Sequence, residues 1–231
     1  MPTLALVDSD SAPPNAPTAL NAPTTPARAA NATRSLFHVA SGALSLAMLR
    51  LLPGRGWIIA ASSAFVVAGW TMEIARRRSH TVNNALMKVF APVAHPHERH
   101  GINSSTWYVT ALLLLSLFAP LRAAELGVLV LAVADPAAGL IGRRFGRTQL
   151  RAGRSLEGTL GFFVVGAVAA ACWLSIVYAV AWPAAALLAA AAAAVGALTE
   201  LGSTRMDDNF TIPVATAVAA AGAALLVLPG V

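Results

Sequence analysis

Long apolar runs separated by short polar segments dominate the chain. The runs predict helices at about 36–52, 57–75, 105–119, 123–141, 158–180, 184–199 and 211–228. A helix crosses a bilayer with about 17–25 mainly apolar residues, so runs of this kind are typical of membrane spans. The pattern therefore predicts an all-α, polytopic membrane bundle of about seven transmembrane helices.

Two segments fall outside this pattern. Residues 1–33 hold six prolines among Ala, Thr and Asn, a composition that buries too little apolar surface to fold, and they predict a disordered cytoplasmic tail. Residues 80–94 are too short and too polar to span a membrane and predict an interfacial amphipathic helix. The remaining residues, 34–231, are expected to form one integral membrane domain.

The composition supports a membrane protein. Hydrophobic residues make up 57% of the chain and charged residues 11%, whereas soluble domains carry about 25% charged residues. The net charge is +6, but the arginines are not interleaved with aromatic residues on which bases could stack, which argues against nucleic acid as a partner. The single cysteine, Cys172, excludes a disulfide framework.

Cations divide unevenly between the polar segments. With the N-terminus inside, 76–104, 142–157 and 200–210 join the tail on the cytoplasmic side, which then holds 13 of the 16 Lys and Arg residues. The positive-inside rule therefore predicts an N-in, C-out topology. The alanine- and arginine-rich usage suggests a bacterial inner membrane.

Most acids lie at or near the same face, which suggests a cytoplasmic active site: Glu73, Glu98, Asp135, Glu157, Glu200, Asp207 and Asp208.

An acid inside an apolar run is the first candidate for chemistry. Asp135 lies about eight residues before the cytoplasmic end of its span and is followed by Pro136. A carboxylate at membrane depth costs about 2.5–3.5 kcal/mol on insertion scales, so it indicates a functional role. We expect a catalytic carboxylate or metal ligand, in a helix that the proline kinks or unwinds locally. The alternative is an acid paired with an arginine for assembly.

A basic segment punctuated by glycines follows, at 142–157. Gly142, Gly146 and Gly153 give it the composition of a phosphate cradle, because glycine lets backbone and cations approach a polyanion closely. The segment does not match the P-loop pattern. A basic loop that only sets the topology is the alternative. The cations available to a cradle are Arg143, Arg144, Arg147, Arg151 and Arg154.

A third polar group comes from Glu200 and the segment 205–213. Asp208 and Asn209 directly precede an apolar run and could simply cap its helix. Carboxylates such as these also suit Mg²⁺, which proteins usually hold with one or two carboxylates plus substrate phosphates. Further polar candidates are Arg34, His38, Glu73, Arg77, Glu98 and Arg99.

Taken in order, these residues resemble the family of CTP-dependent lipid kinases that includes dolichol kinase, phytol kinase and a diacylglycerol kinase of the same type. The likeness covers about 34–225, and the blocks 135–158 and 200–213 are its most specific parts. It is carried by Arg34-x-x-x-His38, Glu73 with Arg77, Glu98-Arg99, DPAAGLIGRRFGR, GRSLEG, Glu200 and DNFTIP.

The resemblance implies transfer of the γ-phosphate of CTP, with Mg²⁺, to the hydroxyl of a lipid alcohol such as a polyprenol, a phytol-like lipid or diacylglycerol. The family's usual lysine in the K-S-x-E-G block is Arg154 here, which leaves the choice between CTP and ATP open because arginine binds phosphate differently. The nucleotide-site roles would fall on Asp135, Gly139, Gly142, Gly146, Ser155, Glu157, Gly158, Glu200, Asp208 and Asn209.

The chemistry is compatible with these roles. Phosphoryl transfer needs positioning and neutralisation of phosphate charge more than covalent help. We expect Asp135 to act as the base, with Glu73 second and Glu157 beside them in the catalytic set. The arginines and the glycine amides would hold the triphosphate. The predicted metal ligands are Asp135, Glu157, Glu200 and Asp208.

Other functions stay open. A reaction like that of phosphatidate cytidylyltransferase would make a CDP-lipid from related substrates. An anion transporter is expected to show polar residues along several spans and matched broken helices in two halves, and neither is visible here. An inactive assembly partner is the third alternative.

Overall fold

The computed structural model describes residues 25–90, 101–203 and 206–227, without the side chains of 25–31 and 152. The described residues are helical throughout except for loops and one isolated bridge between Gln149 and Ser155. The helices are α1 (Thr25–Leu51), α2 (Arg55–Arg78), α3 (His80–Val89), α4 (Ser104–Phe118), α5 (Leu121–Phe145), α6 (Leu156–Tyr178), α7 (Trp182–Gly202) and α8 (Asp208–Val227), with a short 3₁₀ turn, η2 (Arg151–Gly153).

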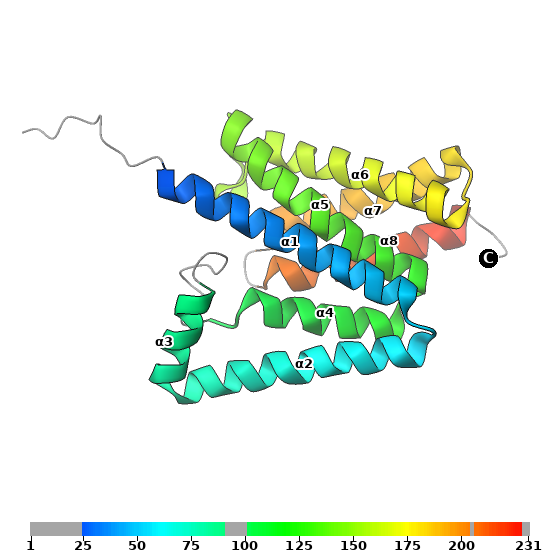
Figure 1. The fold of residues 1–231 in the computed structure, drawn as a ribbon. Helices are drawn as coiled ribbons and strands as arrows, with labels where there is room; N and C mark the ends of the chain where they lie inside the picture. The colour runs from blue at the N-terminus through cyan, green and yellow to red at the C-terminus, as the bar shows by residue number, and fades with distance from the viewer. Residues whose placement is uncertain (1–24, 91–100, 204–205, 228–231) are drawn as a thin grey trace, which may run out of the picture.

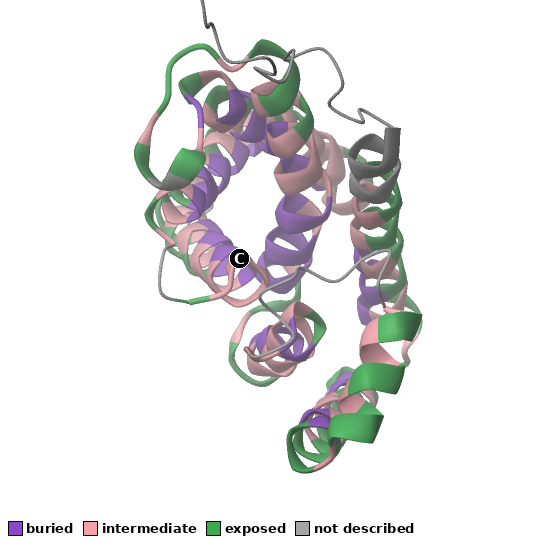
Figure 2. Cartoon of the chain, turned by 90° about the vertical axis from the view of Figure 1, so that its left-hand side faces the viewer, coloured by how far each residue is buried: buried purple, intermediate pink, exposed green. Residues whose placement is uncertain are grey.

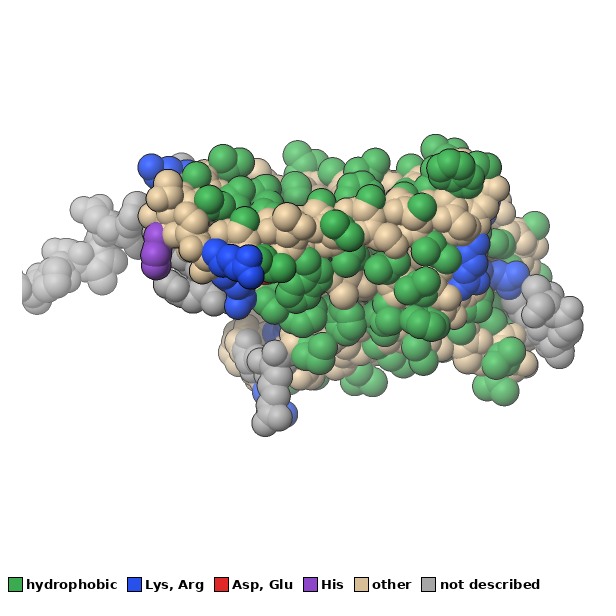
Figure 3. Space-filling view, turned by 90° about the horizontal axis from the view of Figure 1, so that it is seen from below, with side chains coloured by type: hydrophobic (Ala, Val, Ile, Leu, Met, Phe, Trp, Pro, Cys, Tyr) green, Lys and Arg blue, Asp and Glu red, His purple; other side chains and the backbone are tan. Residues whose placement is uncertain are grey.

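Five of these helices, α2, α5, α6, α7 and α8, are long and apolar enough to cross a membrane. The fourth helix, α4, is apolar but shorter. On the face drawn in Figure 3, apolar side chains cover the middle of the molecule and the cationic side chains lie towards its two ends. The predicted all-helical membrane fold is therefore confirmed, and the chain is an integral membrane protein.

The helix α5 lies at the centre of the bundle. It packs against α6 and α8, and α7 closes the group by packing against both of those helices. Buried side chains line the inside of this group, which is seen along its axis in Figure 2. The first helix lies along α5, α4 lies against α8, and α2 packs on the outer side of α4 (Figure 1).

Small residues let the central helices approach closely. A Cβ added at Gly127 of α5 would collide with the carbonyl oxygen of Pro213 in α8, and one at Gly42 of α1 would collide with Ala132. The face that α7 buries is largely alanine. Close packing of small residues is a main source of helix association in lipid, where the hydrophobic effect does not favour one apolar partner over another.

The structure differs from two of the sequence predictions. Residues 25–33 belong to α1, although the sequence predicts a disordered tail there, and residues 1–24 lie outside the described part. The helix α5 continues through Pro136 to Phe145, so the local unwinding predicted at this proline is wrong. A proline removes one backbone hydrogen bond, and packing against neighbouring helices supports the segment despite that loss.

The helix predicted within 80–94 is present as α3, which begins at His80 and ends at Val89. None of its residues is buried, and it packs mainly against α2. In Figure 1 it crosses the end of α2 rather than continuing along it. Residues 91–94 of the predicted segment lie outside the described part.

Candidate functional site

One arginine connects three segments that are far apart in the sequence. Arg154 follows η2, and its Nε lies 2.5 Å from Oε1 of Glu200 near the end of α7. Its Nη2 lies 2.5 Å from Oδ2 of Asp208 at the start of α8. Its Nη1 donates a hydrogen bond to the carbonyl oxygen of Ser203 at 3.3 Å. The basic loop is thereby fixed to the same end of the bundle as the predicted acidic cluster.

Asp135 joins this cluster from α5. Its charge acts on both Glu200 and Asp208, and its Oδ2 lies 3.9 Å from Nε2 of His38 on α1. Two carboxylates thus share the guanidinium group of Arg154, and the carboxylate of Asp135 acts on both of them. The cluster has an excess of negative charge, which favours the binding of a further cation.

Two oxygens of the cluster have no hydrogen-bond partner. Oε2 of Glu200 and Oδ1 of Asp208 are buried and unpaired. A buried, unpaired carboxylate oxygen costs free energy, and such atoms call for an explanation. Within the described residues no group of three His, Cys, Asp or Glu side chains is arranged to hold a metal by itself. Mg²⁺ needs only one or two carboxylates when phosphates complete its shell, so the two oxygens fit this ion.

A cavity of about 240 Å³ lies beside the cluster and is called the basic cavity below. Arg154 and Glu200 line it, so it adjoins the ion pair between these two residues. Most of its wall comes from the predicted phosphate-binding segment. The other lining residues are Ala138, Gly139, Gly142, Arg143, Gln149, Gly153, Ser155, Gly158 and Thr159.

The loop that forms one wall of the basic cavity is held by local hydrogen bonds. Glu157 accepts from the amide of Thr148 at 3.2 Å, and Ser155 caps α6 by accepting from the amide of Gly158 at 3.1 Å. Gly153 has a φ of 74°, a left-handed conformation that favours glycine. The bonds of Glu157 are to the loop and not to the acidic cluster, so its geometry is that of a loop anchor rather than a metal ligand.

Several of the predicted cradle glycines use their backbone amides within the protein. Gly139 and Gly142 lie inside α5, and the amide of Gly146 donates to the carbonyl oxygen of Gly142 at 3.0 Å. The amide of Gly158 is taken by Ser155. The amides of Gly146 and Gly158 are already used within the protein, so these two glycines do not offer them to a phosphate. The glycines instead remove side chains where α5, the loop and α6 meet, which leaves room for the cavity.

Alanine substitutions separate these roles. A Cβ at Gly146 meets the carbonyl oxygen of Gly142 and the side chain of Ser155, whereas one at Gly139 meets only the flexible end of Arg143. We expect Gly146→Ala to lower the free energy of unfolding by about 1–3 kcal/mol. Gly139→Ala should leave stability nearly unchanged. Gly222→Ala, which meets nothing within 4 Å, is the control. Equal melting temperatures for all three variants would contradict this account.

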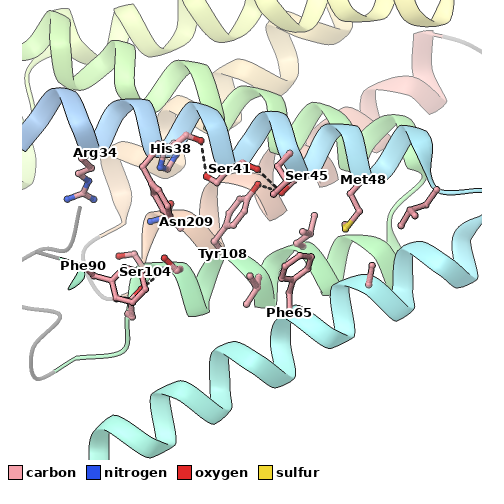
Figure 4. A pocket seen from close by; sticks show the side chains of 18 residues that line it. Arg34, His38, Ser41, Ser45, Met48, Phe65, Phe90, Ser104, Tyr108 and Asn209 are labelled. Carbon is pink, nitrogen blue, oxygen red and sulfur yellow. Dashed lines mark hydrogen bonds between the residues drawn. The ribbon is translucent and has the colours of Figure 1, made fainter. Parts of the chain in front are cut away.

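A second, larger cavity of about 360 Å³ runs between α1, α2 and α4 and is called the apolar groove below. Figure 4 shows its polar end, where Arg34, His38, Ser104 and Asn209 lie near one another. Apolar side chains such as Met48 and Phe65 line the groove further along α1 and α2.

Hydrogen bonds fix the polar residues of the groove. Asp207 accepts from the hydroxyl of Ser104 at 2.8 Å and from the amide group and backbone of Asn209 at 2.8 and 2.9 Å. Tyr108 donates to Ser45 at 2.8 Å across the groove. Asn209, which the sequence assigns to the nucleotide site, therefore lies on the wall of the apolar groove and next to Asp208 of the acidic cluster.

Glu73 lies in a separate cluster on α2. Its carboxylate is 1% exposed and is bound by Arg76 at 2.8 Å and by Arg77 at 2.5 Å. It also accepts from the backbone amide of Asn103 at 3.3 Å. Both carboxylate oxygens are occupied by partners that tie α2 to the start of α4, which is the geometry of a structural ion pair.

We therefore expect Glu73→Gln to act on stability. Removing one partner of a buried ion pair costs about 3 kcal/mol or more, because the buried guanidinium of Arg76 would lose the negative charge that compensates it. Unfolding in detergent would measure the loss, and turnover per folded molecule should change less than threefold. A stable Glu73→Gln protein with lost turnover would restore the predicted catalytic role of Glu73.

Several predicted residues lie outside the two cavities. Arg144 is exposed and stacks over the ring of Phe145 at 5.5 Å, and Arg147 is exposed on the loop. Neither lines the basic cavity. Glu98 and Arg99 fall outside the described residues. The site also includes Asp207 and Ser104, whose bond joins positions that are 103 residues apart, and no local sequence pattern reveals such a pair.

Comparisons of this chain with protein-family models, with curated proteins and with solved structures find no match.

Proposed function

We propose that the protein is a membrane kinase that transfers the γ-phosphate of a nucleoside triphosphate, CTP, to the hydroxyl of a lipid alcohol. The observation that carries the proposal is the position of the acidic cluster between two cavities of different chemistry. Arg154 and Glu200 line the basic cavity, and Arg154 binds Asp208. Asp208 adjoins Asn209 of the apolar groove, and Asp135 lies against His38 of the same groove.

The basic cavity suits the triphosphate. Arg143 and Arg154 face it, and guanidinium groups can bind phosphate oxygens in a bidentate manner. Mg²⁺, when bound to the unpaired oxygens of Glu200 and Asp208, would neutralise the charge that develops on the phosphates. The choice of CTP rests on the family resemblance of the sequence.

The apolar groove suits a lipid alcohol. Its apolar length would hold the hydrocarbon chain, and its polar end would hold the hydroxyl near His38 and Asp135. Asp135 accepts the proton of that hydroxyl while the oxygen forms a bond to the γ-phosphorus. The bond between the γ-phosphorus and the bridging oxygen breaks, and CDP leaves. His38 orients Asp135 and the hydroxyl.

The proposed topology has seven spans. The helices α1 and α4 would join the five long apolar helices, with the N-terminus inside and the C-terminus outside. The acidic cluster and both cavity mouths would then face the cytoplasm of a bacterial inner membrane, and α3 would lie at that surface. The distribution of Lys and Arg supports this orientation.

A label-transfer assay tests the proposal. Purified protein in lipid–detergent micelles would receive γ-labelled CTP or ATP, Mg²⁺ and a panel of polyprenol, phytol-like and diacylglycerol acceptors. We expect label in one class of lipid with CTP. Label transfer with ATP alone would still support kinase activity, and the preference for ATP over CTP would then be attributed to Arg154. An absence of label with folded protein would favour cytidylyl transfer, anion transport or an assembly role.

Filling the groove separates its role from that of the basic cavity. Met48 lines the apolar part of the groove, away from its polar end. A tryptophan at this position would occupy space that the lipid chain needs. Met48→Trp should lower kcat/KM for the lipid at least tenfold and leave the KM for nucleotide unchanged, as measured with each substrate varied in turn. Equal effects on both substrates would contradict the assignment of the groove.

A further inference from the structure

A second polar cluster lies at the opposite end of the bundle, where α1 and α6 end and α5 begins. Its acid is Glu125, which has no exposed surface. Oε2 of Glu125 accepts from the indole of Trp173 at 2.8 Å and from the hydroxyl of Tyr178 at 2.9 Å. Nη1 of Arg50 lies 3.6 Å from Oε1. The acid is therefore fixed by three helices and fully enclosed.

This cluster has an excess of positive charge. The guanidinium groups of Arg50 and Arg122 lie 5.2 and 5.0 Å from the centre of the Tyr178 ring. Both cations thus lie over Tyr178, and of the two Arg50 also pairs with Glu125. Arg55, the third cation of this end, donates to the carbonyl oxygens of Ser116 at 3.1 Å and Leu117 at 2.9 Å and closes the end of α4.

An apolar cavity of about 320 Å³ adjoins Arg122 and is lined by residues of α5, α6, α7 and α8. Arg122 and Tyr178 are part of its wall. The other lining residues are apolar, and they include Leu126, Leu174, Leu188, Ala221 and Leu225. A cationic group and a hydrocarbon-lined space therefore belong to one site.

We propose that this site binds an anionic phospholipid of the membrane leaflet at this end. Arg122, together with Arg50, would contact the phosphate of the headgroup, and one acyl chain would fill the cavity between the four helices. Charge complementarity selects an anionic headgroup, because a zwitterionic lipid leaves the cluster with its surplus positive charge. The proposal also gives a role to Arg50 and Arg122. They are two of the three Lys and Arg residues that the sequence does not assign to the cytoplasmic side.

Lipid retention measured by native mass spectrometry tests the proposal. Delipidated protein would be given equal amounts of phosphatidylglycerol and phosphatidylcholine. We expect retained phosphatidylglycerol, and Arg122→Gln should lower the retained fraction about fivefold, the effect of one cation near an anionic lipid headgroup. Arg78→Gln, the same change at an exposed position of the other end, is the matched control and should retain as much as the wild type.

Two further arms complete the test. Ala224→Phe places a ring in the cavity and should reduce retention while Arg122 is intact. Free glycerol phosphate at the same concentration should not displace the lipid, because it lacks the chain that the cavity holds. Equal retention of the two lipids, unchanged retention in Arg122→Gln, or displacement by glycerol phosphate would each overturn the proposal. A folded protein that retains phosphatidylglycerol but lacks kinase activity would support this lipid site. That result would contradict only the proposed kinase function.

Discussion

Asp135→Asn is expected to lower the rate of lipid phosphorylation about a thousandfold, within the range that a positioned acid or base contributes to catalysis. The amide has nearly the same size but cannot take the proton of the acceptor hydroxyl. The substitution also removes the negative charge that acts on Glu200 and Asp208. The initial rate of lipid phosphate formation measures the effect.

Asp135→Glu is the matched control, because it keeps the carboxylate and shifts it by one methylene group. It should retain more activity than Asp135→Asn by at least tenfold. Unfolding of both variants in detergent separates catalysis from stability, since removing an acid from a cluster with surplus negative charge should not destabilise the protein. An active Asp135→Asn enzyme would show that the acid only pairs with its neighbours for assembly.

Arg154→Met is expected to cause a large loss of stability. The substitution leaves Glu200 and Asp208 without their shared cation, and breaking buried ion pairs of this kind costs about 3–5 kcal/mol. Asp208 keeps some exposure to solvent, so we expect a value near the lower limit, about 3 kcal/mol. Unfolding by detergent titration measures it.

Compensating substitutions separate stability from activity at this residue. Arg154→Met combined with Glu200→Gln and Asp208→Asn removes the unpaired charges and should recover most of the stability but no activity. Arg154→Lys should lose less stability than Arg154→Met, although a lysine cannot bind both acids with one planar group. Arg143→Met, an exposed cation on the same cavity, is the control and should change stability by less than about 0.5 kcal/mol. An unstable triple variant would contradict the role of the ion pairs.

Hydrophobic patterning predicted the helices because each apolar run is long and the runs are separated by polar segments. It also placed the glycine- and arginine-rich loop and the acids Asp135, Glu200 and Asp208 at one end, which the structure brings together. Residues 25–33 hold four alanines and a single proline, Pro26, which lies in the first turn where proline is tolerated, and this explains why a helix can begin at Thr25, where the sequence predicts disorder.

The direction in which each side chain points, and the partner that it meets, could not be predicted from the sequence. Glu73 lies three and four residues before Arg76 and Arg77, a spacing that permits ion pairs on one helix face but does not say whether the acid is buried with them. The position of Asn209 on the groove wall depends on how α8 packs against α4. The bond between Ser104 and Asp207 likewise depends on tertiary packing.

Parallel reactions with α-labelled and γ-labelled CTP test the central claim most directly. Purified wild-type protein would receive the accepted lipid alcohol and the corresponding lipid phosphate together, and labelled lipids would be separated and counted. A kinase site between the basic cavity and the apolar groove predicts label in the lipid from γ-labelled CTP only, with CDP as the other product. Label from α-labelled CTP, with pyrophosphate released, would contradict phosphoryl transfer and assign the site to cytidylyl transfer.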